Sequence, residues 1–220
     1  MPWIGKKGSL TFEESTNNAN IVINYYRSVG FPDTTIAGIM GNMYAESGIN
    51  PNREETGGTG YGLVQWTPVS VLQNACTVLG LSPYTSGDIQ LQVIPQEVLN
   101  HPNIAQWYTS EAFISRFYNS GATPDMVGIT GQQFLSNEMN WTPSKLAIMF
   151  MAGYERPSYD PEVNHWQLRQ QWADYWFEYM GGIIPPEPTA PTNRKTIPIF
   201  LFLMNRRLSC LLYTSPSPET

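Results

Sequence analysis

The chain has 220 residues, with 41% hydrophobic residues, 14% charged residues and a formal net charge of −6. This composition excludes disorder over most of the length, and the negative charge argues against a nucleic-acid partner, because phosphate contacts need clustered lysine and arginine. Two cysteines and two histidines offer too few ligands for a zinc site or a disulfide framework, so we expect no metal and no cofactor.

Two helices are expected at the start of the chain. Residues 11–14 form a capping-box pattern ahead of a stretch with helical apolar periodicity, which Gly30 should end. The second helix should cover residues 33–47 and stop at Gly48, which can adopt the left-handed conformation of a helix terminus. Gly41 on this helix is small enough to allow close approach of a neighbouring helix.

One carboxyl group stands in the last turn of the second helix. Glu46 shares a helical face with Ile39 and Met43, so this face should turn toward the core. Partial burial against apolar groups and the nearby helix carbonyls both disfavour the charged form of a carboxyl group and raise its pKa. We therefore expect Glu46 to donate a proton near neutral pH, the alternative being a solvated residue at a helix end.

The rest of the chain is expected to be mostly helical. Residues 54–66 contain four glycines and end in a short run with strand character, which indicates a small β-hairpin beside the second helix. Residues 119–140 have weak periodicity and are expected to form a loop. Further helices should run from Thr67 to Gly80, from about Asp88, from Thr142 to Tyr154 and from Asp160 to Met180. The expected fold class is α+β and predominantly α-helical.

The composition changes after Gly182. Residues 1–182 are expected to form one globular domain, and residues 183–196, rich in proline, a stiff linker. Residues 197–220 are too few for a domain and too short an apolar run for a membrane span. This tail is either truncated or non-native sequence, or an interaction tail.

Three motifs carry a resemblance to a known family. The stretches GNMYAESGINP at 41–51, GYGLVQWT at 60–67 and AIMFMAGYERP at 147–157 resemble the phage tail lysozymes. The likeness covers roughly residues 13–182. That family is similar in turn to goose-type lysozymes and soluble lytic transglycosylases.

The resemblance implies a lysozyme-like fold and cleavage of peptidoglycan glycan strands. The expected activity is that of a muramidase, a glycoside hydrolase acting between N-acetylmuramic acid and N-acetylglucosamine. Two alternatives stay open: a lytic transglycosylase that forms 1,6-anhydro products, and a non-catalytic wall-binding module of the phage tail. Fold likeness alone does not prove chemistry.

The resemblance also implies roles for two carboxyl groups. Glu46 would be the general acid that protonates the glycosidic oxygen. Glycosidases generally use a second carboxylate, and Glu155 is the candidate for it. The alternative for Glu155 is an ion pair with Arg156 that orders the helix end.

Five further residues are expected to bind the substrate or shape its site. Ser47 either hydrogen-bonds the wall of the site or caps the helix. Gln65 should donate to a sugar N-acetyl group or to the loop after Glu46. Tyr61, Trp66 and Tyr154 could stack on sugar faces. The tryptophans at 166, 172 and 176 recur at helical spacing and are expected in the core.

The expected place of action is the bacterial cell wall. The N-terminus lacks the apolar segment of a secretory signal and the chain has no run of eighteen apolar residues, so we expect synthesis in the host cytoplasm and no membrane partner. A virion tail would carry such an enzyme to peptidoglycan, with other tail proteins as further partners.

Overall fold

The computed structural model describes residues 2–188, and within this range the chain is predominantly helical. The expected linker covers residues 183–196, and its part from 189 to 196 lies outside the described residues, as does the expected tail at 197–220. The helical elements in chain order are α1 (Phe12–Ser28), α2 (Asp33–Ser47), α3 (Ser70–Leu79), α4 (Gly87–Val98), α5 (Glu111–Ile114), the 3₁₀ helices η1 (Ser115–Ser120) and η2 (Pro124–Met126), α6 (Gly131–Ser136), α7 (Pro143–Phe150), the π-helix η3 (Met151–Glu155) and α8 (Trp166–Met180).

Local signals set the ends of α1 and α2 as expected. Thr11 Oγ1 accepts from the Glu14 amide at 3.2 Å, and a Glu14 carboxyl oxygen accepts from the Thr11 amide at 2.8 Å, which closes the capping box. Gly48 ends α2 in the left-handed conformation, with φ of 68°. The first two helices were therefore predicted correctly.

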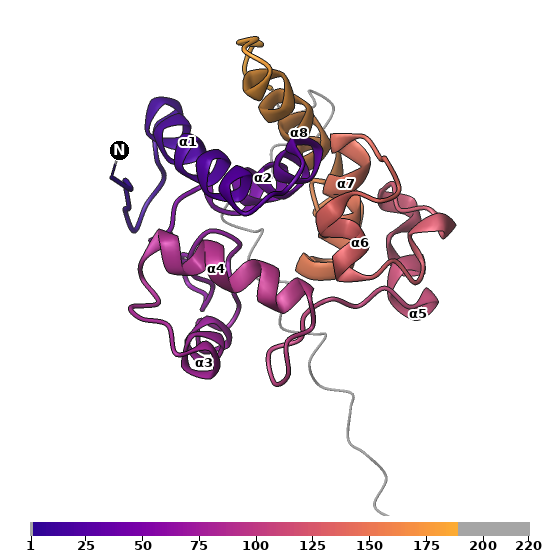
Figure 1. Ribbon diagram of the computed structural model, residues 1–220, viewed down its shortest axis with the longest axis horizontal. Helices are drawn as coiled ribbons and strands as arrows, with labels where there is room; N and C mark the ends of the chain where they lie inside the picture. The colour runs from indigo at the N-terminus through magenta and orange to yellow at the C-terminus, as the bar shows by residue number, and fades with distance from the viewer. Residues whose placement is uncertain (1, 189–220) are drawn as a thin grey trace, which may run out of the picture.

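Helix α2 lies at the centre of the molecule and packs most extensively against α8 and α7. In Figure 1, α8 extends to the top of the view and α3 lies at the lower left, with α2 between them. Gly41 permits the close packing on α8, because a Cβ atom there would lie 2.4 Å from the Arg169 carbonyl oxygen. Gly38 does the same toward α7, where a Cβ atom would meet Leu146 at 2.8 Å. The expected close approach of neighbouring helices to α2 is confirmed.

The β-hairpin expected over residues 54–66 is not formed. Within residues 2–188 this segment makes only two isolated antiparallel bridges, Glu54 with Tyr61 and Tyr61 with Trp66. Gly62 and Gln65 both have positive φ, of 82° and 52°, which curls the backbone into a tight turn where strands would need extended residues. The segment is a compact turn, and the β part of the predicted α+β class is not confirmed.

Two helix starts and one expected loop differ from the expectation. Helix α3 begins at Ser70 instead of Thr67, and α8 begins at Trp166 instead of Asp160. Asp160 does accept from the Glu162 amide at 2.9 Å, but this closes a local turn and the chain does not enter the helix until after His165. The stretch 119–140, expected as a loop, contains η2 and α6.

Helix α7 changes its winding within the third motif. Thr142 caps α7 as expected, and the helix continues as the π-helix η3, which carries Tyr154 and Glu155. Arg156 then ends it in the left-handed conformation, with φ of 47°. Short π-helical turns inside helices occur frequently at functional sites.

The core expected from the tryptophan spacing is confirmed for two of the three residues. Trp172 is 2% exposed and Trp176 is 0% exposed, whereas Trp166 is partly buried and packs against the edge of the core. Among residues 2–188, none of the helices has both the length and the apolar character needed to cross a membrane.

Candidate functional site

Glu46 lies in the last turn of α2 and forms an ion pair with Arg169 of α8. Nη2 of Arg169 donates to Oε1 of Glu46 at 2.6 Å, and the two side chains are 0% and 4% exposed, respectively. The expected burial of Glu46 is therefore confirmed. The contact joins two residues on different helices, at the C-terminus of α2 and in the first turns of α8.

The expected surroundings of Glu46 were wrong. The carboxyl group was expected against apolar groups, and the structure places a buried guanidinium group on it. Burial favours the neutral form of a carboxyl group, whereas a cation at this distance favours the charged form. The environment of Glu46 therefore combines two opposing effects.

Arg169 is itself held in place by a buried polar network. Its Nη1 donates to Oδ1 of Asn42 at 2.9 Å, and its Nε donates to the Asn164 carbonyl oxygen at 3.1 Å. Asn42 in turn donates to the Ala147 carbonyl oxygen at 2.9 Å, and the Asn164 side chain donates to Ser120 at 2.6 Å. The network fixes the guanidinium group from three sides, so the position of the Glu46 carboxyl group is fixed as well.

Ser47 connects the end of α2 to the turn of the second motif. Its Oγ lies 2.8 Å from the Leu63 carbonyl oxygen and 3.1 Å from the Met43 carbonyl oxygen, both of which are acceptors. The same Oγ accepts from the Asn50 amide at 3.1 Å. Ser47 therefore joins the end of α2 to the turn of the second motif, and its place in the wall of a substrate site stays a prediction.

The turn at residues 59–67 is held by buried glutamines. Nε2 of Gln65 donates to the carbonyl oxygens of Gly62 and Arg53, at 3.0 and 3.1 Å. Gln90 of α4 accepts from the Leu63 amide at 2.9 Å and donates to the Pro51 carbonyl oxygen at 2.8 Å. Gln65 therefore donates to backbone oxygens of the segment after Glu46, and a bond from Gln65 to a sugar N-acetyl group stays a prediction.

The three aromatic residues expected to stack on sugars are buried. Tyr61, Trp66 and Tyr154 are 8%, 5% and 5% exposed, respectively. The Tyr61 hydroxyl accepts from Asn52 at 2.8 Å, and the Tyr154 ring stacks on Phe150 at 4.5 Å between centroids. Stacking on a sugar needs an accessible ring face, so direct sugar contact by these rings stays a prediction that this conformation does not favour.

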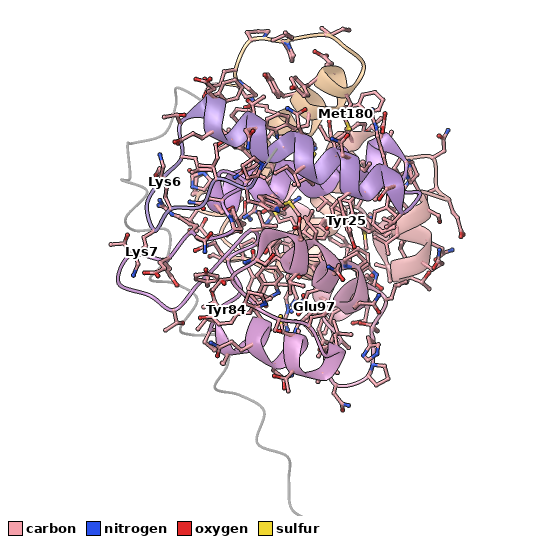
Figure 2. All side chains as sticks on the ribbon, turned by 60° about the vertical axis from the view of Figure 1, so that its left-hand side comes forward. Lys6, Lys7, Tyr25, Tyr84, Glu97 and Met180 are labelled. Atoms are coloured by element: carbon pink, nitrogen blue, oxygen red, sulfur yellow. The ribbon has the colours of Figure 1, made fainter. Side chains whose placement is uncertain are left out.

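Trp66 and Tyr154 meet at a carboxyl group that the sequence interpretation missed. The indole Nε1 of Trp66 donates to Oε2 of Glu97 at 3.0 Å, and the Tyr154 hydroxyl donates to the same oxygen. Glu97 is fully buried in α4 and is labelled in Figure 2. Burial raises the pKa of Glu97 to about 7, against the lowering effect of the two hydrogen bonds and of the Arg156 charge.

Glu155 is the last residue of the π-helix η3 and is 9% exposed. Its neighbour Arg156 donates to the Gln106 backbone and side-chain oxygens at 2.6 and 2.7 Å and lies 4.6 Å from the Tyr108 ring centroid. These contacts dock the end of η3 on the segment around Gln106. The assignment of Glu155 as a second carboxylate stays a prediction.

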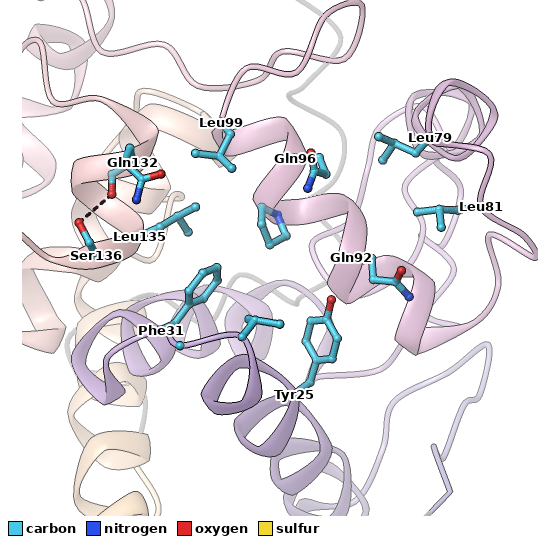
Figure 3. Close-up of a pocket in the computed structure, with 13 residues that line it drawn as sticks. Tyr25, Phe31, Leu79, Leu81, Gln92, Gln96, Leu99, Gln132, Leu135 and Ser136 are labelled. Atoms are coloured by element: carbon cyan, nitrogen blue, oxygen red, sulfur yellow. Dashed lines mark hydrogen bonds between the residues drawn. The ribbon is translucent and has the colours of Figure 1, made fainter.

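Two hollows of the described residues lie elsewhere on the surface. One, of about 640 Å³, is bordered by α1, α3, α4 and α6, and Figure 3 shows Tyr25, Phe31, Gln92, Gln96 and Leu135 around it. The other, of about 410 Å³, lies beside Trp166 on α8. Neither is lined by any of the seven residues predicted for the site.

Arg169 and Glu97 each left a weak signal in the sequence. Arg169 lies three residues from Trp166 and from Trp172, so it shares the apolar face of a helix where a charge needs a partner. Glu97 lies three residues after Ile94 and seven after Gln90, again on a buried face. A charged residue on an apolar helical face indicates a buried polar contact, although it does not identify the partner.

The comparisons with known proteins agree with this arrangement of motifs. The model of the phage tail lysozyme family matches residues 17–180. This range includes all three motifs that carry Glu46, Gln65 and Glu155. The chain therefore belongs to the phage tail lysozyme family.

A relative of known name places the chain in a phage context. A protein named Morphogenesis protein 1, from Bacillus phage B103, is 32% identical over 183 residues. The match covers 80% of this chain and 43% of that protein, so the chain spans less than half of the length of this relative.

Proposed function

We propose that this chain is a muramidase that hydrolyses the glycosidic bond between N-acetylmuramic acid and N-acetylglucosamine, with Glu46 as its general acid. The supporting observation is the position of Glu46 within the family match: its carboxyl group stands at the end of α2, 4% exposed and oriented by Arg169. A general acid acts efficiently when its proton is held in a fixed direction.

The contact with Arg169 assigns different roles to the two carboxyl oxygens of Glu46. When Glu46 is protonated, Arg169 can still donate to Oε1, and the transferable proton is then carried by Oε2. In the proposed reaction this proton passes to the glycosidic oxygen as its bond to the muramic acid carbon breaks. Water then adds to that carbon as a hydroxyl group and gives up one proton, which restores the acid. The carboxylate that remains is stabilised by Arg169 without movement of the network.

Glu155 is the proposed second carboxylate. It is carried on the irregular end of the α7 helix and is close enough to Tyr154 for its charge to raise the pKa of the Tyr154 hydroxyl, after burial and the charge of Glu97. In a glycosidase such a group serves as base or nucleophile. Ser47 and Gln65 are proposed to keep the wall of the site in position, and Tyr61, Trp66 and Tyr154 remain proposed contributors to substrate binding.

The phage relative supports a role on the virion. A tail-borne lysozyme would be brought to the cell wall by the particle, which removes the need for electrostatic attraction between an acidic protein and an anionic wall. The proposed partners are therefore peptidoglycan strands and neighbouring tail proteins.

The test compares wild type with Glu46→Gln on purified Gram-positive cell walls. Glutamine keeps the shape and can still accept from Arg169, but it has no carboxyl proton, so clearing should fall by about 10²–10⁴-fold. Glu178→Gln is the matched control, because Glu178 is exposed on α8 and its change removes the same charge. Circular dichroism and a thermal melt establish that both variants are folded.

The products distinguish the possible reactions. Mass spectrometry should find reducing-end muramic acid in the wild-type digest. Anhydro products would assign a transglycosylase instead. Equal clearing by wild type and Glu46→Gln would remove Glu46 as the acid, and no clearing by folded wild type would indicate a wall-binding module.

A further inference from the structure

Glu97 is a buried ionisable group outside the proposed chemistry. It belongs to α4, whereas the proposed acid and second carboxylate belong to α2 and η3. Its Oε2 receives both hydrogen bonds, from Trp66 and Tyr154, and its Oε1 is buried without a hydrogen-bond partner among the described residues. Because Oε2 accepts two hydrogen bonds and Oε1 accepts none within residues 2–188, a proton on this carboxyl group is best placed on Oε1.

The two donors of Glu97 stand next to the proposed site in the sequence. Trp66 follows Gln65 in the turn at residues 59–67, where the Leu63 carbonyl oxygen accepts from the Ser47 hydroxyl. Tyr154 precedes Glu155 at the end of η3. Glu97 therefore joins the segment bonded to the helix end of Glu46 with the segment that carries Glu155.

We propose that Glu97 is a positioning residue for the glycan cleavage assigned to Glu46, and that its neutral form holds the turn at residues 59–67 and the end of η3 in their working arrangement. This inference rests on the proposed function. The neutral carboxyl group can accept both hydrogen bonds at Oε2 without placing an uncompensated charge in the core. Once ionised, the group places a charge in the core that burial disfavours more than the two hydrogen bonds favour it, so the turn and the end of η3 open toward water.

Charged and titratable groups from several elements surround Glu97. Arg156, at the end of η3, is the cation whose field lowers the pKa of Glu97. Burial and, after it, the charge of Glu97 raise the pKa of the Cys76 thiol on α3, and burial raises that of Tyr154 well above its ordinary value. Tyr26 and Glu155 act on Tyr154 in the same direction. Burial raises the pKa of Glu97 to about 7, so Glu97 changes charge near neutral pH.

The first measurement is the rate of glycan release against pH for wild type and Glu97→Gln. Glutamine reproduces the neutral form, with an acceptor oxygen for both donors. The ratio of variant to wild-type rate should stay within about twofold of one at pH 6 and rise about tenfold by pH 8, because a group with a pKa of about 7 is then about one-tenth neutral. Glu178→Gln, the exposed control, should give a constant ratio.

The second measurement does not depend on activity. The indole N–H signal of Trp66 in ¹⁵N-labelled protein, assigned with Trp66→Phe, should shift with a midpoint near pH 7 in wild type and stay constant in Glu97→Gln. If the ratio of the Glu97→Gln rate to the wild-type rate is constant from pH 6 to 8, the positioning role is overturned, even if the indole signal titrates. An indole signal that does not titrate in wild type would overturn the titration of Glu97.

The two measurements separate this inference from the proposed function. If Glu46→Gln retains full activity, the general acid has been assigned wrongly. The rate ratio and the indole titration of Glu97→Gln would still report on Glu97 in that case. If Glu46→Gln is inactive and the Glu97→Gln ratio is constant, only the positioning role fails.

Discussion

Arg169 contacts Glu46 from the same face of α8 that buries Trp172 and Trp176. The guanidinium nitrogen lies 2.6 Å from the carboxyl oxygen, and both side chains are almost entirely buried. The helix that completes the core thus also completes the proposed site. Any change that displaces α8 from α2 should therefore affect stability and activity together.

Replacement of Arg169 by methionine should lower the free energy of unfolding by about 3–5 kcal/mol, because it leaves Glu46 and Asn42 buried without their common partner. Urea unfolding at pH 7 measures this loss. Arg27→Met is the matched control, because the Arg27–Asp33 pair is exposed and should contribute no more than about 1 kcal/mol. Equal losses of the free energy of unfolding in the two variants would mean that the buried pair contributes no more to stability than the exposed pair.

Gly41→Ala should separate α2 from α8. The new Cβ atom would lie 2.4 Å from the Arg169 carbonyl oxygen and 2.8 Å from the Ala173 amide nitrogen, both backbone atoms that cannot rotate away. The clash should outweigh the helix propensity of alanine and leave a net loss of about 1–3 kcal/mol. Gly8→Ala, with nothing within 4 Å of its Cβ atom, should be neutral in the same thermal melts. A stabilised Gly41→Ala would refute the close packing at this position.

Gly62→Ala should disrupt the turn at residues 59–67 and leave the packing of α2 on α8 unchanged. Gly62 has a positive φ of 82°, and a Cβ atom there would lie 2.6 Å from the Gln90 side-chain oxygen that holds the Leu63 amide. We expect a loss of about 1–3 kcal/mol from strain and displaced packing. Gly57→Ala provides the control, since it shares the positive φ but has open space around it. A larger loss at Gly57 than at Gly62 would contradict the role of the Gln90 contact.

Local features of this fold could be predicted from the sequence because their causes lie within a few residues. The capping box at Thr11, the left-handed stop at Gly48 and the Thr142 cap are each decided inside one helical turn. Asp160 shows the limit of this reasoning, since the same type of signal closes a turn there and the helix starts later, at Trp166.

The composition of the site depends on contacts that no local pattern encodes. Glu46 and Arg169 are separated by 123 positions in the chain, and Glu97 meets Tyr154 across 57. The motifs identified Glu46, but its partner Arg169 lies in a stretch whose tryptophans the sequence predicts to be in the core, and no motif marks it. The hairpin was mispredicted for a related reason, because the positive φ of Gln65 is stabilised by side-chain contacts formed only in the folded turn.

Glu97 should make the stability of the protein depend on pH between about 4.5 and 7. Burial raises the pKa of Glu97 from 4.5 to about 7, so in this window the folded protein binds a proton that the unfolded chain has lost. The free energy of unfolding should therefore fall as the pH rises from 4.5 to 7, with the contribution of Glu97 fully present below 4.5 and lost above 7.

The size of this effect is on the order of 3 kcal/mol, since each unit of pKa shift corresponds to about 1.4 kcal/mol. Urea unfolding of wild type and Glu97→Gln at several pH values measures it. The glutamine variant should be the more stable of the two at pH 8, and the difference between them should shrink toward pH 5. Glu178→Gln, which removes an exposed charge, should follow the wild-type curve. If Glu97→Gln and wild type keep the same difference from pH 5 to 8, Glu97 does not change its protonation in this range.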